Sequence, residues 1–178
     1  MTIPTPNDEQ ARELYRLRRY YWTEARRCEE AKAYLAGSAM AAAALEAMLM
    51  LMVNVYPEEA EQTGKAPRRS NGTIKPLLDW NLGQLLAVAK SANWLPSELD
   101  LATDKWSNRR ARIGDYAEIC RIVRNLIHPG NYVTEHLRKR ITANYLRRQF
   151  ETVEGCGDWL AARNAESLRG LMRDEGIV

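Results

Sequence analysis

The sequence predicts an all-α protein, an antiparallel bundle of about five or six helices, and three observations favour this class. Apolar residues recur at steps of three and four over several long segments, which is the spacing of one helix face. No segment alternates convincingly between apolar and polar residues, as a half-buried strand would. The 178 residues are 46% apolar and 28% charged, a composition typical of a soluble globular domain. We therefore expect one helical domain over residues 1–178, with its core at about 8–165.

The first expected helix begins near Asn7, whose side chain can accept a hydrogen bond from the first helical turn. Asp8 and Glu9 follow, and negative charge stabilises a helix start. One face of this helix is apolar, with Leu14, Leu17, Tyr21, Ala25, Cys28 and Ala31. The opposite face carries Arg12, Arg16, Arg19, Glu24, Arg26, Arg27 and Glu30, and we interpret it as solvated surface.

Strong helix formers dominate residues 28–56, so a second helix either follows the first or continues it through a bend at Gly37 and Ser38. Its longest apolar run, 39–53, is shorter than the roughly 20 residues that a membrane helix needs. The run also carries Glu46 in its middle. We expect a buried central helix and no membrane association.

The rest of the chain divides at loop-forming residues. Residues 63–76 contain two prolines and two glycines without apolar periodicity and form the clearest loop. Asn81 and Gln84 form a capping pattern for a short helix that Pro96 closes, and residues 96–98 can start a further turn. A helix over about 109–128 should end at Pro129, followed by a polar segment to about 140. The last helix, through 145–160, is weakened by Gly155 and Gly157, and 161–178 should be fraying helix.

Several classes of chemistry are excluded by composition. The three cysteines fit no zinc spacing, there are only two histidines, and no glycine-rich phosphate loop or serine elbow is present. No secretory leader opens the chain, so a reducing cytoplasm is the expected location. We expect neither a metal nor a cofactor. The formal net charge of +3 does not by itself indicate nucleic-acid binding, but residues 105–148 carry a net +8.

A group of polar residues in the expected helix 113–128 carries the functional argument. Those that share one face of its helical wheel are Glu118, Arg121, Asn125 and His128. Arg124 falls between that face and the apolar stripe, so its guanidinium should be partly buried and needs an acceptor. Glu46, inside its apolar helix, needs a partner for the same reason. We predict that Glu46 contacts Arg124 or Arg121, either as a structural pair or as support for an active site.

His128 is expected at the C-terminal end of this helix because it precedes Pro129. An imidazole beside guanidinium groups can take a proton from a ribose hydroxyl while the arginines hold the phosphate. That is the chemistry of RNA cleavage without a metal ion. The alternative is that His128 only caps the helix end through a hydrogen bond to a carbonyl.

Basic residues flank the His128 helix in sequence and are candidates for an RNA-binding rim. They are Arg109, Arg110, Arg112, Arg138, Lys139 and Arg140. Tyr132, in the segment after the helix, is a candidate for stacking on a base. The alternative interpretation is that both basic runs are ordinary solvated surface.

The run Arg121-Ile-Val-Arg124-Asn125-Leu-Ile-His128-Pro129-Gly130, at the end of a helix in an all-helical chain, resembles the HEPN superfamily (higher eukaryotes and prokaryotes nucleotide-binding domains). Residues 44–49 and 82–86 also look like its stand-alone bacterial members, so the likeness spans roughly 28–160. The resemblance implies a helical bundle that dimerises through its motif helices. Catalytic members are metal-independent endoribonucleases that use an Arg with a polar follower and a His four to six residues further on. Many act as toxins, with a cognate antitoxin, or in defence.

Neither arginine matches the whole HEPN pattern. Arg124 has the polar follower Asn125, but only three residues separate it from His128. Arg121 is followed by the apolar Ile122, with six residues before His128. The resemblance thus leaves open which arginine would serve. It also leaves a non-catalytic alternative, a dimeric regulatory module or one that binds nucleic acid or a nucleotide, because some branches of the superfamily serve only as binding or scaffold domains.

Overall fold

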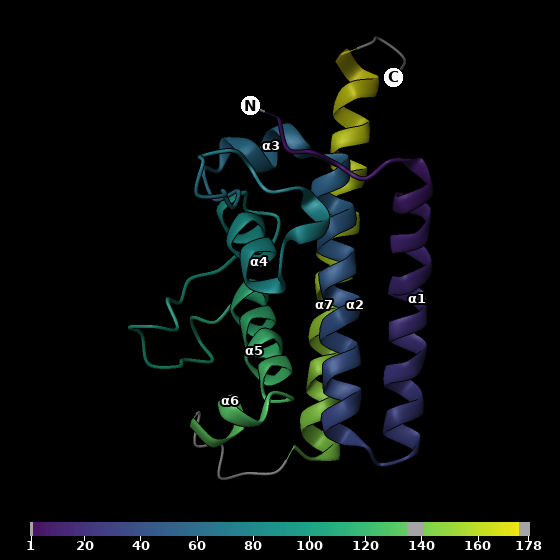
Figure 1. Ribbon diagram of the computed structural model, residues 1–178, viewed down its shortest axis with the longest axis vertical. Coiled ribbons are helices and arrows are strands. Elements are labelled where there is room, and N and C mark those ends of the chain that lie inside the picture. Colours follow the sequence, from purple (N-terminus) through teal and green to yellow (C-terminus); the bar gives the residue numbers. More distant parts are fainter. Residues whose placement is uncertain (1, 135–140, 175–178) are drawn as a thin grey trace.

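The computed structural model describes residues 2–134 and 141–174, and the side chains up to residue 165. Within these ranges the chain forms seven α-helices and one short 3-10 helix, with no strand (Figure 1). The all-α prediction is confirmed, with more helices than the five or six expected. The elements are α1 (Asp8–Glu30), α2 (Tyr34–Val55), α3 (Pro57–Gln62), η1 (Leu77–Asp79), α4 (Leu82–Ser91), α5 (Ile113–Asn125), α6 (Pro129–Thr134) and α7 (Ala143–Asp174).

Helix α2 is the central element of the fold. It contacts α1 and α7 along its length, and α4 and α5 cover its other side (Figure 1). By length and composition α2 could cross a membrane, but 67% of its most apolar window is buried within the fold. The core around it is continuous from Ile3 to Leu160. The expected buried central helix is therefore found, and its apolar character is explained by packing on both sides.

The turn between α1 and α2 lies at residues 31–33, where Lys32 adopts a positive φ of 58°. Of the two alternatives, a second helix that follows the first is the one found, and no bend lies at Gly37 and Ser38, which are buried inside α2. A Cβ at position 37 would lie 3.1 Å from Cys28 Cβ and 2.9 Å from a methyl carbon of Leu146. The glycine thus permits close approach of α1 and α7 rather than breaking the helix.

Two helix starts follow the capping patterns in the sequence. In each, an asparagine side chain accepts from the backbone N–H three residues later, and a glutamine side chain accepts from the asparagine N–H. The distances are 2.9 and 3.0 Å for Asn7 and Gln10, and 3.0 Å twice for Asn81 and Gln84. The expected 63–76 loop also lies between helices and contains one isolated antiparallel bridge, between Arg68 and Ile74.

Helix α5 is shorter than expected at both ends, spanning 113–125 instead of 109–128. Residues 96–98 do not start a helical turn, because they pack against the first turn of α5. There the buried carboxylate of Asp115 accepts hydrogen bonds from the Ser97 hydroxyl and from the backbone N–H groups of Glu98, Leu99 and Arg112. Gly114 permits this contact, since a Cβ there would lie 2.7 Å from the Leu95 carbonyl oxygen.

The apolar stripe expected on this helix comprises Ile113, Tyr116, Cys120, Val123 and Ile127. The buried side of α5 matches it only in part. It consists of Ala117, Cys120 and Val123, whereas Tyr116 is 37% exposed and Ile127, beyond the helix, is 56% exposed. The segment after α5, expected to be polar and irregular, contains the short helix α6. Proline is well tolerated at a first helical position, which is where Pro129 stands.

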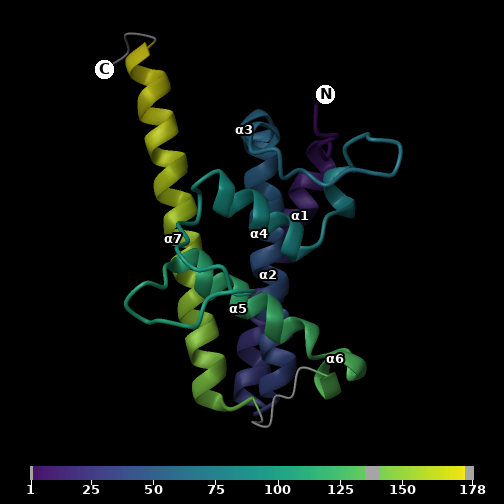
Figure 2. The same ribbon diagram turned by 90° about the vertical axis from the view of Figure 1, so that its left-hand side faces the viewer.

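Helix α7 is continuous over 32 residues despite Gly155 and Gly157. Both glycines lie at packing contacts, because a Cβ would lie 3.1 Å from Ile113 Cδ1 at position 155 and 3.6 Å from Met48 Sδ at position 157. The helix continues to Asp174, and its C-terminal part projects beyond the other helices (Figure 2).

Candidate functional site

Glu46 and Arg124 form the centre of the candidate site. The Glu46 Oε2 and Arg124 Nη2 atoms are 2.9 Å apart, and the two side chains are 13% and 35% exposed. The predicted contact between Glu46 and one of the two arginines is therefore confirmed, and Arg124 is the partner. The pair joins α2 to α5 at the edge of the core.

A third helix, α4, also reaches this carboxylate. The backbone N–H of Leu82, the first residue of α4, donates a hydrogen bond to Glu46. A helix N-terminus carries a partial positive charge and so favours a carboxylate. Burial nevertheless raises the pKa of Glu46 above its usual 4.5, and the opposing effects of Arg124 and the Leu82 N–H do not cancel it.

Arg121 has a different partner, one turn back on its own helix. Its Nε donates to Glu118 Oε1, and these side chains are 31% and 17% exposed. The aliphatic part of Arg121 lies over the start of α4, because a Cβ on Gly83 would be 3.2 Å from Arg121 Cδ. Each arginine thus has its own carboxylate, and the four charges sum to zero.

His128 lies three residues beyond the end of α5, so its expected place on the polar helix face is wrong. Its N–H donates to the Asn125 carbonyl at 3.1 Å in a tight turn, and the side chain is exposed. Pro129 explains the change, because a proline disfavours helical geometry at the residue before it. The His128 carbonyl then accepts the Tyr132 N–H at 3.0 Å, within the first turn of α6.

Asn125 ties this turn to α6 through its backbone rather than its side chain. Its carbonyl oxygen accepts both the His128 N–H and the Asn131 side-chain amide, the latter at 3.2 Å. Tyr132 is 39% exposed on α6, within the stretch that follows His128. The stacking role predicted for Tyr132 stays a prediction, and so does the place of Asn125 in the candidate site as the polar follower of Arg124.

The structure separates the first basic run from His128. Arg109, Arg110 and Arg112 are exposed and precede α5, whereas His128 follows it. A helix of 13 residues is about 20 Å long, so the two features lie at opposite ends of it. Arg112 is also paired with Glu98 at 2.6 Å. The second run, Arg138, Lys139 and Arg140, lies outside the described residues.

One aromatic pair beside this basic run was not expected from the sequence. Trp106 and Tyr116 pack edge to face with ring centroids 5.0 Å apart, and they are 41% and 37% exposed. Only the folded loop brings together two aromatic residues ten positions apart, so no local spacing indicates the pair.

Other reactive groups in the described part of the chain do not form a second centre. Burial raises the pKa of Cys120 to about 12 and raises that of Cys156 as well, so neither thiol is an activated nucleophile. No group of three or more His, Cys, Asp or Glu in the described ranges could hold a metal ion.

Fold and site together define an all-helical protein with a charge-balanced cluster where α2, α4 and α5 meet. Comparisons of the chain with family models, with curated proteins and with solved structures found no match. Its function must therefore be inferred from its own residues.

Proposed function

We propose that the protein acts on RNA as a metal-independent endoribonuclease of HEPN-like type, with its site at the C-terminal end of α5. The supporting observation is the fixed position of Arg124. The nearly buried Glu46 holds one of its terminal nitrogens at 2.9 Å, while about a third of the side chain stays open to solvent. His128, beyond the same end of the helix, is exposed. An anchored arginine and an accessible imidazole are what metal-free phosphodiester cleavage needs.

In this proposal His128 takes the proton from a ribose 2′-hydroxyl. The resulting oxygen attacks the adjacent phosphorus, the bond to the 5′-oxygen breaks, and that oxygen takes a proton from water. His128 then returns its proton to the hydroxide that is left. The products are a cyclic phosphate and a 5′-hydroxyl end. Arg124 or Arg121 neutralises the phosphate, with Glu46 and Glu118 as their positioning residues. Such a protein would work in the cytoplasm as a dimer through its motif helix, in a toxin or defence role with a cognate antitoxin.

The test is cleavage of a mixed-sequence RNA in EDTA by the wild-type protein and by His128→Ala. The matched control is His136→Ala, which removes the only other histidine of the chain. We expect wild type and His136→Ala to produce cyclic-phosphate ends and His128→Ala to produce none. Arg124→Ala and Arg121→Ala then identify the arginine that serves. Cleavage by His128→Ala at the wild-type rate, or no cleavage by folded wild type, would contradict the proposal.

A second candidate is a non-catalytic dimeric module that regulates a partner or binds nucleic acid or a nucleotide. The four balanced charges support it, because Glu46 and Glu118 already neutralise both arginines. Exposed apolar side chains beside His128 also suit a protein contact. They are Ile127 at 56% and Val133 at 71% exposure.

Sedimentation tests this second candidate independently of cleavage. If the α5–α6 end is a dimer interface, Ile127→Lys and Val133→Lys should each shift the protein toward monomer, while Val55→Lys, at an exposed position on α2, should not. A wild-type protein that is monomeric at high concentration would contradict the dimer in both candidates.

A further inference from the structure

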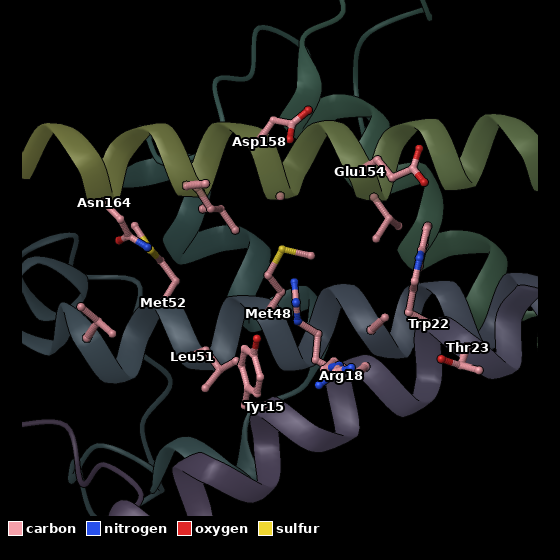
Figure 3. Close-up of a pocket in the computed structure, with 17 residues that line it drawn as sticks. Tyr15, Arg18, Trp22, Thr23, Met48, Leu51, Met52, Glu154, Asp158 and Asn164 are labelled. Carbon is pink, nitrogen blue, oxygen red and sulfur yellow. The ribbon is translucent and has the colours of Figure 1, made fainter.

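A groove of about 670 Å³ lies between α1 and α7, with α2 as its floor (Figure 3). This volume is within the range of small-molecule sites, roughly 300–1,000 Å³. Met48, Leu51 and Met52 form most of the floor, and Tyr15 and Trp22 stand on the α1 wall. The floor is therefore apolar and adaptable, since methionine side chains adjust to different shapes.

The groove is closed at one end and open at the other. At the closed end Arg26 joins the two walls, because it bonds Glu154 at 2.7 Å and lies 4.2 Å from the Phe150 ring centroid. Trp22 packs edge to face on the same ring, with centroids 5.2 Å apart. From there α7 diverges from α1 toward its C-terminal end (Figure 2). The groove is therefore open at this end because the axes of α1 and α7 diverge.

Two buried polar atoms on the groove lining have no hydrogen-bond partner among the described residues. They are the Nε–H donor of Arg18 and the Oδ1 acceptor of Asn164. A buried polar group without a partner is unfavourable, so each of these atoms favours a ligand that supplies the missing hydrogen bond. Arg18 extends from α1 over the α2 floor (Figure 3). Its Cζ lies 5.4 Å from the centroid of the Tyr15 ring, and its Nε–H has no acceptor among the described residues.

The charges around Arg18 favour an anion. Arg19 lies on the same wall, and the carboxylate of Glu154 is already paired with Arg26. The remaining acid of the lining, Asp158, points away from the floor on the outer side of α7 (Figure 3). The Nε and a terminal nitrogen of an arginine form a fork that fits the two oxygens of a carboxylate.

We propose that this groove binds an apolar carboxylic acid that carries a hydroxyl group away from its carboxylate. The carboxylate takes the fork of Arg18, the hydrocarbon lies on Met48, Leu51 and Met52, and the hydroxyl donates to Asn164. The site is separate from the α5 cluster, so the proposal does not depend on RNA cleavage.

The experiment is calorimetric titration of the full chain with ω-hydroxydecanoate below its micellar range. Decanediol, which has the same length and no charge, is the matched ligand. We expect the acid to bind the wild-type protein at least tenfold more tightly than the diol, because a hydrogen bond to a charged group contributes about 1.5 kcal/mol or more. Equal affinity for the two, or no binding of the acid, would overturn the proposal. This comparison needs no variant.

Arg18→Gln extends the test to the residue itself. We expect it to lower the affinity for the acid about tenfold and to leave the diol unaffected. The control is Arg16→Gln on the same helix, whose side chain is 77% exposed and paired with Glu13. Affinity for the acid that is unchanged in Arg18→Gln, or equally reduced in Arg16→Gln, would contradict the assignment.

Discussion

The two ends of α5 differ in how completely their charged side chains are paired within the fold. At the N-terminal end Asp115 is fully buried, and one hydroxyl and three backbone N–H groups bond to its carboxylate. At the C-terminal end Arg124 has one carboxylate partner and is 35% exposed. The first arrangement uses every acceptor position for the fold, whereas the second leaves a charged group within reach of another molecule. The N-terminal end is thus fully paired within the fold, whereas the C-terminal end keeps the partly exposed charge that the proposed function requires.

The pKa shifts of the two carboxylates show the same contrast. Burial acts to raise the pKa of Asp115, but its four hydrogen bonds outweigh burial and lower the pKa below 3.8. Burial also acts to raise the pKa of Glu46, and there it outweighs Arg124 and the Leu82 N–H. Of these two carboxylates, the one with four hydrogen-bond donors has the lowered pKa, and the one with a single arginine and one backbone N–H has the raised pKa.

The largest expected effect on stability comes from Asp115→Ala, which removes the carboxylate at the N-terminal end of α5. The change leaves three N–H groups and the Ser97 hydroxyl without their acceptor, so we expect the free energy of unfolding to fall by about 3–5 kcal/mol. Urea denaturation measures this. Asp79→Ala, at an exposed ion pair, is the control and should lower stability by about 0.5 kcal/mol or less. A loss below about 1 kcal/mol for Asp115→Ala would mean that water replaces the carboxylate.

A smaller effect is expected from Glu46→Ala at the other end. It leaves Arg124 without its acid, but the guanidinium is partly exposed and water can solvate it, so we expect a loss of about 2 kcal/mol. Glu46→Gln should lose about 1 kcal/mol or less, because the amide still accepts from Leu82 and carries no buried charge. Equal losses for the two variants, in the same urea experiment, would show that charge pairing with Arg124 dominates the site.

The dependence of stability on pH separates the two carboxylates further. Since the pKa of Asp115 is lowered, its contribution is present above pH 3.8 and is lost as the pH falls through the native pKa. Since the pKa of Glu46 is raised, its contribution is present below pH 4.5 and is lost as the pH rises through the native pKa.

We therefore expect Asp115→Asn to approach wild-type stability only below pH 3.8. The stability that Glu46→Gln loses relative to wild type should be smallest near neutral pH and larger below pH 4.5. Thermal unfolding at a series of pH values measures both trends. A Glu46→Gln difference that does not vary between pH 4 and pH 7 would contradict the raised pKa.

The smallest effect on stability is expected from His128→Ala. The side chain is exposed, so the free energy of unfolding should change by about 0.5 kcal/mol or less. RNA cleavage should nevertheless be lost if His128 transfers the proton. A clear loss of stability, measured by urea denaturation, would instead support the interpretation of His128 as a structural cap.

Local features of the fold and one long-range contact were predictable, whereas the other long-range features were not. The helix starts at Asn7 and Asn81 depend on residues three positions apart, so the sequence pattern was sufficient. The contact between Glu46 and Arg124 was predictable because each charge stands in or beside an apolar stripe. The hydrogen bonds to the Asp115 carboxylate could not be predicted, since three of the donors lie 16–18 residues earlier in an irregular loop.

Two errors have specific physical causes. The end of α5 was expected at His128 because Pro129 follows it, whereas in the structure α5 ends at Asn125 and Pro129 begins α6. The groove was not predicted, although Arg18, like Glu46, is a charged residue within an apolar stripe of its helix. It stands four residues after Leu14 and three before Tyr21, within the apolar stripe of α1. The residues named for the solvated face of this helix do not include Arg18, and no role was predicted for it.

The overhang of α7 has a consequence for the protein in solution. Its 32 residues make a rod of about 48 Å, against about 33–35 Å for α1 and α2 with 23 and 22 residues. A spherical domain of 178 residues has a radius of gyration of about 16 Å. Small-angle X-ray scattering of the monomer should therefore give a larger radius and a pair-distance distribution with a tail at long distances.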